Sequence, residues 1–307
     1  MILCCGEALI DMLPRESTRG EPAFAPHPGG AVFNTALALG RLGVKTGFFS
    51  GLSTDLFGQM LTDALTASGV ETGLSARSDR PTTLAFVTLH DGQARYAFYD
   101  EGTAGRMLSP ADLPALPRDL RALFFGGISL AVEPCATAYE ALMIRAAADH
   151  LTMLDPNIRP GFIRDEAGYR ARIGRMIAAA DIVKLSDEDP DWLTGPGAIE
   201  PRARAILARG PKLVFITEGA RGAHGFSTTG AIFVPAQQVA VVDTVGAGDT
   251  FNAGVLAALD RAGLLSKQAV AAADGAVLEA CLRLGTAAAA VTVARAGANP
   301  PWKEDLE

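Results

Sequence analysis

Short apolar runs alternate with longer amphipathic runs along most of this 307-residue chain. The short runs have the length of buried strands and lie at residues 122–125, 151–154, 182–185 and 213–217. The longer runs have helical spacing and lie at residues 134–149, 166–179 and 201–208. Because strands that alternate with helices build a parallel sheet covered on both faces, the sequence predicts a doubly wound α/β fold with three layers.

The N-terminal part follows the same alternation. Strands are predicted at residues 1–10 and 45–51, and helices at residues 31–42 and from the capping residue Asp55 to Gly69. The last third, residues 246–296, is rich in alanine and predicted to be helical.

Two segments depart from this alternation. Residues 12–28 are rich in proline and charge, and residues 82–99 alternate around an Asp91-Gly92 turn, which is typical of a β-hairpin. We expect the segments 12–28 and 82–103 to form a small β-sheet lid, inserted in a single domain that spans residues 1–307. Two surface loops are the alternative.

Charge and composition argue against several classes of protein. The formal net charge is −7, whereas a nucleic-acid-binding protein commonly carries a basic stripe. No run of about 18 uncharged apolar residues is present and the N-terminus has no basic segment, so neither a membrane span nor a signal peptide is expected. The four cysteines form no C-x-x-C pair, which favours buried reduced thiols in a cytoplasmic protein. The histidines lack the spacing of zinc ligands.

Residues 243–254 carry the strongest chemical signal. An apolar run at 239–242, predicted to be a strand, leads into Gly246-Ala247-Gly248, and a helix follows. The small residues let three successive backbone N–H groups face outward at a helix N-terminus, where partial positive charge gathers. This arrangement suits an anion, above all a phosphate in transfer.

Asp249 follows this turn and has two interpretations. It could be a plain capping residue, because the helix dipole stabilises a carboxylate in the first turn. It is also placed to take a proton from an alcohol during phosphoryl transfer. Other phosphate motifs do not fit: position 251 is Phe where a dinucleotide fingerprint needs Gly, and the chain has no Gly-Lys pair for a P-loop.

Residues 243–254 resemble the C-terminal signature of the ribokinase-like (PfkB-type) carbohydrate kinases, and residues 28–43 resemble the N-terminal signature of that family. The two stand in the family's order, and Asp11, the DPNIR segment at 155–159 and the TEGARG segment at 217–222 extend the resemblance over nearly the whole chain. It implies the ribokinase-like fold with a small β-sheet lid, and the phosphorylation of a sugar hydroxyl by ATP.

The resemblance also implies roles for individual residues. Asp249 would be the general base, and the backbone of Gly246, Ala247 and Gly248 would form the anion hole for the transferred phosphate. The sugar would be bound by Asp11, Gly29, Gly30, Asn34, Tyr99, Arg106, Asn157 and Arg159. The nucleotide would be bound by Lys184, Ser186, Thr217, Gly219, Gly222 and Gly248. The residues alone leave simpler roles open: a solvated helix face for Asn34, a turn for the glycines and a structural ion pair for Arg159.

Two metal ions follow from the resemblance. Magnesium would neutralise the charge on the ATP phosphates. Many family members carry Asn-x-x-Glu after the strand that holds Lys184, and here Ser186 and Asp189 stand at these positions, with Glu188 as a competitor for the water-mediated magnesium site. A monovalent cation such as K⁺ would be held by backbone oxygens near Asp243, Val245 and Gly297.

The segment 98–106 (FYDEGTAGR) resembles the fructokinase branch of the family. The related 2-dehydro-3-deoxygluconokinases hold a substrate carboxylate, usually with an arginine in the lid where this chain has Asp100. We therefore expect phosphorylation of the 6-hydroxyl of D-fructose, with 2-keto-3-deoxygluconate as the alternative substrate because Arg106 and Arg159 remain.

A non-catalytic protein that binds sugar and nucleotide is the alternative from another class, and the presence of Asp249 disfavours it. The expected partners are a small sugar and ATP, with no nucleic acid and no membrane. The lid sheet offers an exposed edge or face, so we expect a homodimer formed through the lid.

Overall fold

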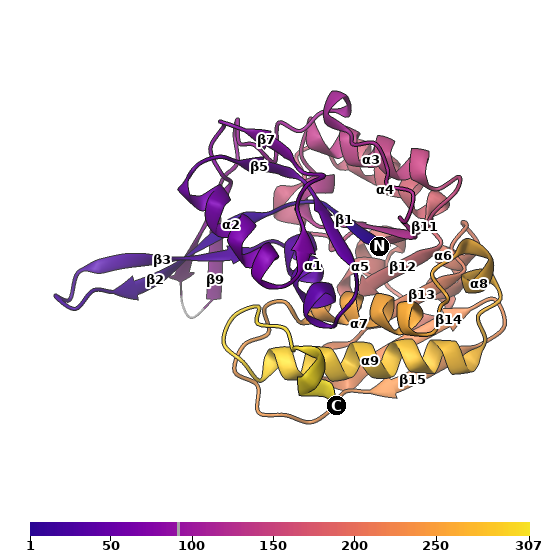
Figure 1. Ribbon diagram of the computed structural model, residues 1–307. Coiled ribbons are helices and arrows are strands. Elements are labelled where there is room, and N and C mark those ends of the chain that lie inside the picture. Colours follow the sequence, from indigo (N-terminus) through magenta and orange to yellow (C-terminus); the bar gives the residue numbers. More distant parts are fainter. Residues whose placement is uncertain (91–92) are drawn as a thin grey trace.

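The computed structural model describes residues 1–90 and 93–307, and its centre is a large sheet with helices on both faces (Figure 1). Within these residues the sheet has nine strands in the order β15-β14-β13-β12-β11-β10-β1-β4-β6. Their bounds are β1 (Ile2–Cys5), β4 (Thr46–Phe49), β6 (Val70–Glu71), β10 (Ala122–Gly126), β11 (Leu151–Asp155), β12 (Ile182–Ser186), β13 (Leu213–Thr217), β14 (Gly222–Ser227) and β15 (Ala231–Pro235). The strands from β6 to β13 pair in parallel, and β14 and β15 add an antiparallel edge, which confirms the predicted mostly parallel sheet.

Each face of the large sheet has its own hydrophobic core. Because successive side chains of a strand point to opposite faces, Ile2 and Cys4 join one core while Leu3 and Cys5 join the other. The first core is covered by α1 (Ala31–Arg41), α2 (Leu56–Ala67), α7 (Ala247–Arg261), α8 (Lys267–Ala271) and α9 (Gly275–Val293). The second is covered by α3 (Cys135–Ala146), α4 (Glu166–Ala179), α5 (Glu188–Thr194) and α6 (Ile199–Leu207). All four cysteines are buried and free, as predicted.

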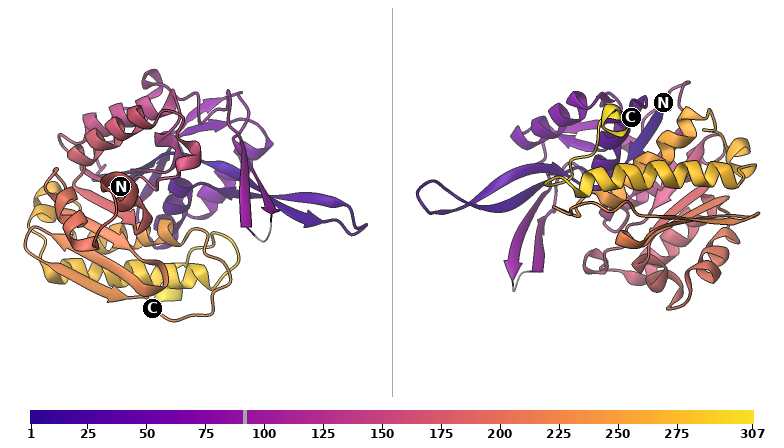
Figure 2. Two further views of the ribbon diagram at one scale, coloured as in Figure 1. Left: turned by 180° about the vertical axis from the view of Figure 1, so that it is seen from behind. Right: turned by 90° about the horizontal axis from the view of Figure 1, so that it is seen from below.

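Of the described helices, α9 alone is long and apolar enough to cross a membrane. In this structure it packs against α7 and against β14 and β15, which is the arrangement of a core helix. Figure 2 shows part of α9 lying beside the strands at the β15 edge of the large sheet.

A second, four-stranded sheet projects away from the large one (Figures 1 and 2). Its order is β3 (Pro22–Gly29), β2 (Leu9–Glu16), β8 (Leu84–His90) and β9 (Gln93–Tyr99). We call these four strands the small sheet. The two segments predicted to leave the main fold therefore form one sheet and not two loops. The predicted Asp91-Gly92 turn lies outside the described residues.

Two of the predicted strands are wrong in extent. The predicted strand 1–10 divides into β1 and β2, because the chain passes close to α1 at Gly6, where an added Cβ would lie 2.4 Å from Val32 Cγ2. The predicted strand 45–51 divides into β4 and β5 (Gly51–Ser53), which pairs with β7 (Ala76–Ser78) in a separate two-stranded sheet.

The predicted strand at residues 239–242 is absent from the structure, and this segment has no regular secondary structure. The backbone N–H groups of Val242 and Asp243 donate to the carbonyl of Val293 at 2.8 and 3.2 Å. The end of α9 therefore takes the hydrogen bonds that a neighbouring strand would have taken, and the Val242 side chain stays exposed.

Candidate active site

Asp249 lies in the first turn of α7 and is only 8% exposed. The helix begins after Gly246, whose φ of 79° is in the left-handed region. A Cβ there would lie 2.8 Å from the Cβ of Ala298, so both the backbone angle and the space favour glycine. The turn that the sequence predicts to be an anion hole is therefore a helix N-terminus with a buried carboxylate beside it.

Helix α1 supplies the direct partners of Asp249. Asn34 Nδ2 donates to Asp249 Oδ2 at 2.9 Å, and Thr35 Oγ1 donates to the Asp249 carbonyl at 3.2 Å. Burial raises the pKa of Asp249 to about 7, although the bond from Asn34 opposes this rise. A carboxylate with a pKa near the operating pH is well suited to take a proton as a general base.

Lys184 and Asn252 share one carboxylate next to Asp249. Lys184 Nζ and Asn252 Nδ2 donate to Asp155 Oδ2 at 3.0 and 2.7 Å, and all three side chains are buried. Burial alone would lower the pKa of Lys184, but the carboxylates of Asp155 and Asp189 outweigh it and the pKa is raised. A Cβ added at Gly248 would lie 3.1 Å from Lys184 Nζ, so a fixed positive charge stands at the start of α7.

Two amide oxygens of this site have no hydrogen-bond partner in the part of the chain that the structure describes: Asn34 Oδ1 and Asn252 Oδ1. A buried acceptor without a donor costs free energy, so native structures satisfy nearly all of them. The Asn34 amide donates to Asp249 and the Asn252 amide donates to Asp155. A hydroxyl group of a ligand could donate the hydrogen bond that each amide oxygen lacks.

The residues predicted to organise magnesium are engaged with one another. Asp189 is buried, and its Oδ2 accepts from the backbone N–H and the hydroxyl of Ser186 at 2.7 and 2.8 Å. Its Oδ1 accepts from the Ile158 N–H at 2.8 Å, which ties the end of β12 to the segment after β11. Glu188 is exposed. Among the described residues no three His, Cys, Asp or Glu side chains gather as a metal site.

The predicted sugar-binding residues near α1 come together at the base of the small sheet. Asp11 lies inside β2, whereas the predicted strand 1–10 would have ended just before it. A Cβ at Gly29 would lie 2.2 Å from Asp11 Oδ2, so glycine leaves room for this carboxyl, and burial raises its pKa to about 6. Gly30 follows with a φ of 111° and begins α1, one turn before Asn34.

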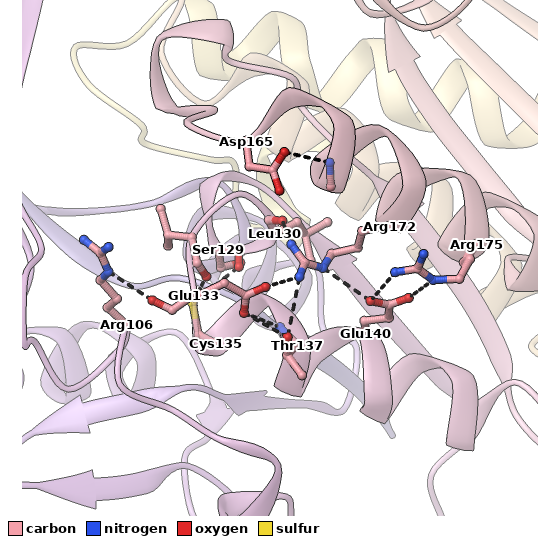
Figure 3. A network of polar contacts seen from close by, with 12 residues as sticks. Arg106, Ser129, Leu130, Glu133, Cys135, Thr137, Glu140, Asp165, Arg172 and Arg175 are labelled. Atoms are coloured by element: carbon pink, nitrogen blue, oxygen red, sulfur yellow. Dashed lines mark hydrogen bonds and ion pairs between the residues drawn. The ribbon is translucent and has the colours of Figure 1, made fainter.

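Arg106 and Arg159 line a separate pocket of about 440 Å³ between the small sheet and the segment after β11. Arg106 Nη1 pairs with Asp100 Oδ1 at 2.9 Å, and its Nε donates to the Glu133 carbonyl at 3.2 Å (Figure 3). The described lining of this pocket includes neither Asp249 nor Tyr99, which is 64% exposed. The predicted sugar residues therefore form two groups.

Asn157 lies in the segment after β11, two residues before Arg159. Its φ of 44° is left-handed, and its N–H donates to Asp155 Oδ1 at 3.1 Å.

The predicted nucleotide and cation residues lie at the carboxyl edge of the large sheet and beyond it. Thr217 ends β13, and its hydroxyl donates to the Leu185 carbonyl at 3.4 Å. Gly219 (φ 53°) and Gly222 (φ 134°) form the turn into β14.

The three predicted cation residues meet around one carboxylate. Asp243 Oδ1 accepts from the N–H of Val245 and Asp243 Oδ2 accepts from the N–H of Gly297, each at 3.0 Å. These contacts bring the backbone before α7 against the backbone after α9.

Sequence reasoning missed three side chains of this site. Asn252 stands three positions after Asp249 on the same helix face, so helical spacing could have found it. Asp155 ends a predicted strand at the carboxyl edge, where open α/β sheets bind ligands. Glu7 contacts both α1 and the turn after β10, and no local pattern marks it.

A large mostly parallel sheet, a separate small sheet and a buried carboxylate at a late helix N-terminus define a ribokinase-like α/β protein. The model of the pfkB family of carbohydrate kinases matches residues 1–305, so the chain belongs to this family, whose members transfer a phosphoryl group to a hydroxyl.

Named relatives agree with this assignment. A protein named Fructokinase from Rhizobium leguminosarum bv. trifolii is 57% identical over 274 residues, which cover 89% of this chain and 84% of that protein. The crystal structure of a fructokinase with bound ATP from Xylella fastidiosa has a TM-score of 0.87 at 30% identity, over 99% of this chain and 97% of that one. A Vibrio cholerae O395 fructokinase double mutant bound to fructose, ADP and potassium has a TM-score of 0.84 at 26% identity, over 97% and 93%.

Proposed function

We propose that this protein transfers the γ-phosphoryl group of ATP to the 6-hydroxyl of D-fructose, with Asp249 as the general base. The observation that carries the proposal is the buried Asp249 carboxylate, whose pKa is about 7, at a helix N-terminus beside Lys184. In phosphoryl transfer, a carboxylate with this pKa next to the phosphate site is suited to take the proton of the attacking hydroxyl.

The chain's own groups divide the reaction between them. Asp249 takes the hydroxyl proton as the oxygen bonds to the γ-phosphorus, and the bond from the γ-phosphorus to the β–γ bridging oxygen breaks to release ADP. The backbone N–H groups of Gly246 and Gly248 would face the developing negative charge, and the Ala247 N–H, which donates to the Thr244 carbonyl at 3.4 Å, would have to turn to join them. Lys184 adds a fixed cation on the phosphate side, while Asn34 holds the base in one orientation.

Fructose is supported by the relatives named fructokinase and by the charge of the arginine pocket. Asp100 already neutralises Arg106, so the pocket offers less positive charge to a sugar acid than its arginines suggest. Arg159 lines the same pocket, which keeps 2-keto-3-deoxygluconate as the second candidate.

The remaining roles follow the same assignment. The small sheet would close over the sugar as a lid and exclude water from the transfer. Magnesium would enter with ATP, with Ser186, Asp189 and Glu188 near its water shell, and K⁺ would bind to backbone oxygens near Asp243, Val245 and Gly297. The proposed compartment is the cytoplasm.

A homodimer through the small sheet is supported by a row of three aromatic rings on it. Phe24 packs edge-on against Phe86, and Phe86 against Tyr99, with centroids 5.0 and 5.4 Å apart. Phe24 is 42% exposed and Tyr99 64% exposed, so the row presents apolar surface that a second copy would cover. Sedimentation as a monomer at micromolar concentration would contradict the dimer.

The test is ADP release from ATP and magnesium with a panel of sugars. We expect turnover with fructose, and ³¹P and ¹³C NMR should place the phosphate on carbon 6. No ADP release with any sugar would overturn the kinase reaction, and a higher kcat/KM for 2-keto-3-deoxygluconate would replace fructose as the substrate. The same assay with and without K⁺ tests the monovalent cation.

A further inference from the structure

Glu7 joins three parts of the molecule at the point where the two sheets meet. It lies in the short link between β1 of the large sheet and β2 of the small sheet. One carboxylate oxygen accepts from the N–H of Ala31 at 3.0 Å, and the other accepts from the N–H of Ser129 at 3.2 Å. Ala31 is the first residue of α1, and Ser129 lies in the short 3₁₀ helix η2 (Ile128–Leu130) after β10.

The Glu7 carboxylate serves as the missing cap of α1. The N-cap residue of this helix is Gly30, which has no side chain to accept from the first free N–H groups. Two glycines make room for this distant cap. A Cβ at Gly127 would lie 2.0 Å from Glu7 Oε1, and a Cβ at Gly30 would lie 3.0 Å from the Glu7 carbonyl oxygen. Both glycines have positive φ angles, 73° and 111°, so the backbone is shaped around Glu7 on two sides.

The other partner of Glu7 is held rigidly. Arg172 donates from Nη1 to the Leu130 carbonyl at 3.3 Å and pairs with Glu133 and Glu140 (Figure 3). The Ser129 hydroxyl donates to the Gly126 carbonyl at 3.0 Å, and the Cys135 thiol is shared between the carbonyls of Val132 at 3.2 Å and Ser129 at 3.4 Å. Ser129 is therefore a fixed point, and the bond through Glu7 sets the start of α1 against it.

Helix α1 carries Asn34, the hydrogen-bond partner of the proposed base Asp249. Asn34 lies one turn after Gly30, its N–H donates to the Gly30 carbonyl at 2.8 Å, and its amide donates to Asp249. A shift at the helix start would move the Asn34 amide, and a displacement of about 1 Å near a reacting group can cost about 100-fold in rate.

We propose that Glu7 is a positioning residue for the transfer reaction: by capping α1 against η2 it sets the Asn34 amide on Asp249. The inference rests on the proposed role of Asp249 as base. Glu7 itself does not touch the reacting atoms, so its effect passes through Asn34.

The test is a double-mutant cycle in kcat/KM for the sugar, built on Glu7→Asp and Asn34→Ala. Aspartate keeps the charge but is one methylene shorter, so it cannot reach both N–H groups. We expect Glu7→Asp to lower kcat/KM by about 10- to 100-fold. We expect little further loss when it is added to Asn34→Ala, because both changes remove the same contact.

A pH profile separates positioning from general loss of stability. The Asn34 bond lowers the pKa of Asp249, so its loss in Glu7→Asp should move the acidic limb of kcat/KM to higher pH. The variant keeps a carboxyl at position 7 and leaves Asp155 and Lys184, the other two charged groups that act on Asp249, in place.

Asp181→Asn is the matched control, since it removes a buried carboxylate that is bound to Thr152 and Lys267 but has no bond to α1 or η2. Its effect should multiply with that of Asn34→Ala and leave the limb in place. If Glu7→Asp does not fold, Glu7→Gln keeps the length and one acceptor and replaces it in the cycle.

Multiplicative losses for Glu7 and Asn34, or an unmoved acidic limb, would overturn the inference while leaving the kinase intact. An Asp249→Asn protein as active as the parent would overturn the proposed function instead.

Discussion

Two aspartate–lysine pairs, each with a buried carboxylate, stand at opposite ends of β11, and they differ in the polar groups around them. At the amino end, Asp181 accepts from the Thr152 N–H at 2.9 Å, from the Thr152 hydroxyl at 3.2 Å and from Lys267 at 2.7 Å through both carboxylate oxygens. At the carboxyl end, Asp155 accepts from Lys184 and Asn252.

The carboxyl-end pair is accompanied by two buried amide oxygens without donors, whereas at the amino end the unpartnered buried atom among the described residues is a ring nitrogen, Nδ1 of His150 just before β11. In the described residues, the nearby amides of Asn34 and Asn252 each leave one buried oxygen without a donor. An aspartate–lysine pair therefore has a different role at each end of β11. The closed pair at the amino end joins β11, β12 and α8, whereas the open one keeps polar groups in reserve for a ligand.

The largest effect on activity is expected at the carboxyl end of β11, from replacing the proposed general base Asp249. Asp249→Asn keeps the shape of the side chain but cannot take a proton, so kcat should fall by about 10²–10⁴-fold. ADP release under saturating ATP and sugar measures this, with circular dichroism as the check on folding. The asparagine variant should also melt at a higher temperature than the parent at pH 8, because the raised pKa of Asp249 shows that burying its charge opposes folding at that pH.

The next effect concerns the lysine of each pair. Lys184→Met removes the cation beside Gly248 and should lower kcat/KM for ATP by about 10- to 100-fold, the value of a charge-assisted hydrogen bond. Lys267→Met is its counterpart at the amino end and should leave kcat/KM for ATP unchanged. Equal losses of kcat/KM for ATP in the two variants would show that the carboxyl-end lysine has no special role in the reaction.

The pH dependence gives a smaller, graded effect. The pKa of Asp249 is raised to about 7, so the base holds a proton below that pH and is free above it. The kcat/KM for sugar should therefore fall about tenfold per pH unit below the inflection and level off above it. Asn34→Ala removes a bond that lowers this pKa, so its inflection should move to higher pH. An inflection near pH 4 in the parent would show that the pKa of Asp249 is not raised.

The smallest expected effect on activity comes from the amino end. Asp181→Asn should leave kcat/KM unchanged and lower the free energy of unfolding by about 1.5–3 kcal/mol, because it weakens bonds to a charged group. Urea unfolding measures the stability and the coupled assay measures the rate. If Asp181→Asn lost activity while its free energy of unfolding stayed unchanged, the Asp181–Lys267 pair would take part in the reaction, and the contrast between the two ends of β11 would be wrong.

The sequence predicts the central strands well because they are short, apolar and bounded by turn residues. It also places Asp249, since its signal is local: glycines that open a helix N-terminus and a carboxylate one residue later. It fails at residues 239–242, where a valine-rich run has strand propensity but finds its hydrogen bonds at the end of α9. Propensity reports what a segment prefers, and the tertiary contact decides.

Glu7 shows the other limit of sequence reasoning. Its two partners, Ala31 and Ser129, lie 24 and 122 positions away in the chain. No periodicity or motif connects residues at such separations, so only the folded arrangement reveals the cap. The same holds for Asn34 and Asp249, which are 215 positions apart and meet only when α1 and α7 pack together.

The tie between Ser186 and Asp189 bears on how this chain could have diverged from relatives that carry Asn and Glu at these positions. Asp189 holds the Ser186 hydroxyl on one oxygen and the Ile158 N–H on the other, so exchanging either residue alone strips a donor or overfills the space around a buried carboxylate. A change from Asn and Glu to Ser186 and Asp189, or the reverse, would therefore pass through a single mutant that is less stable than either pair. The two sites should therefore evolve together, and grafting only one of them should cost more stability than grafting both.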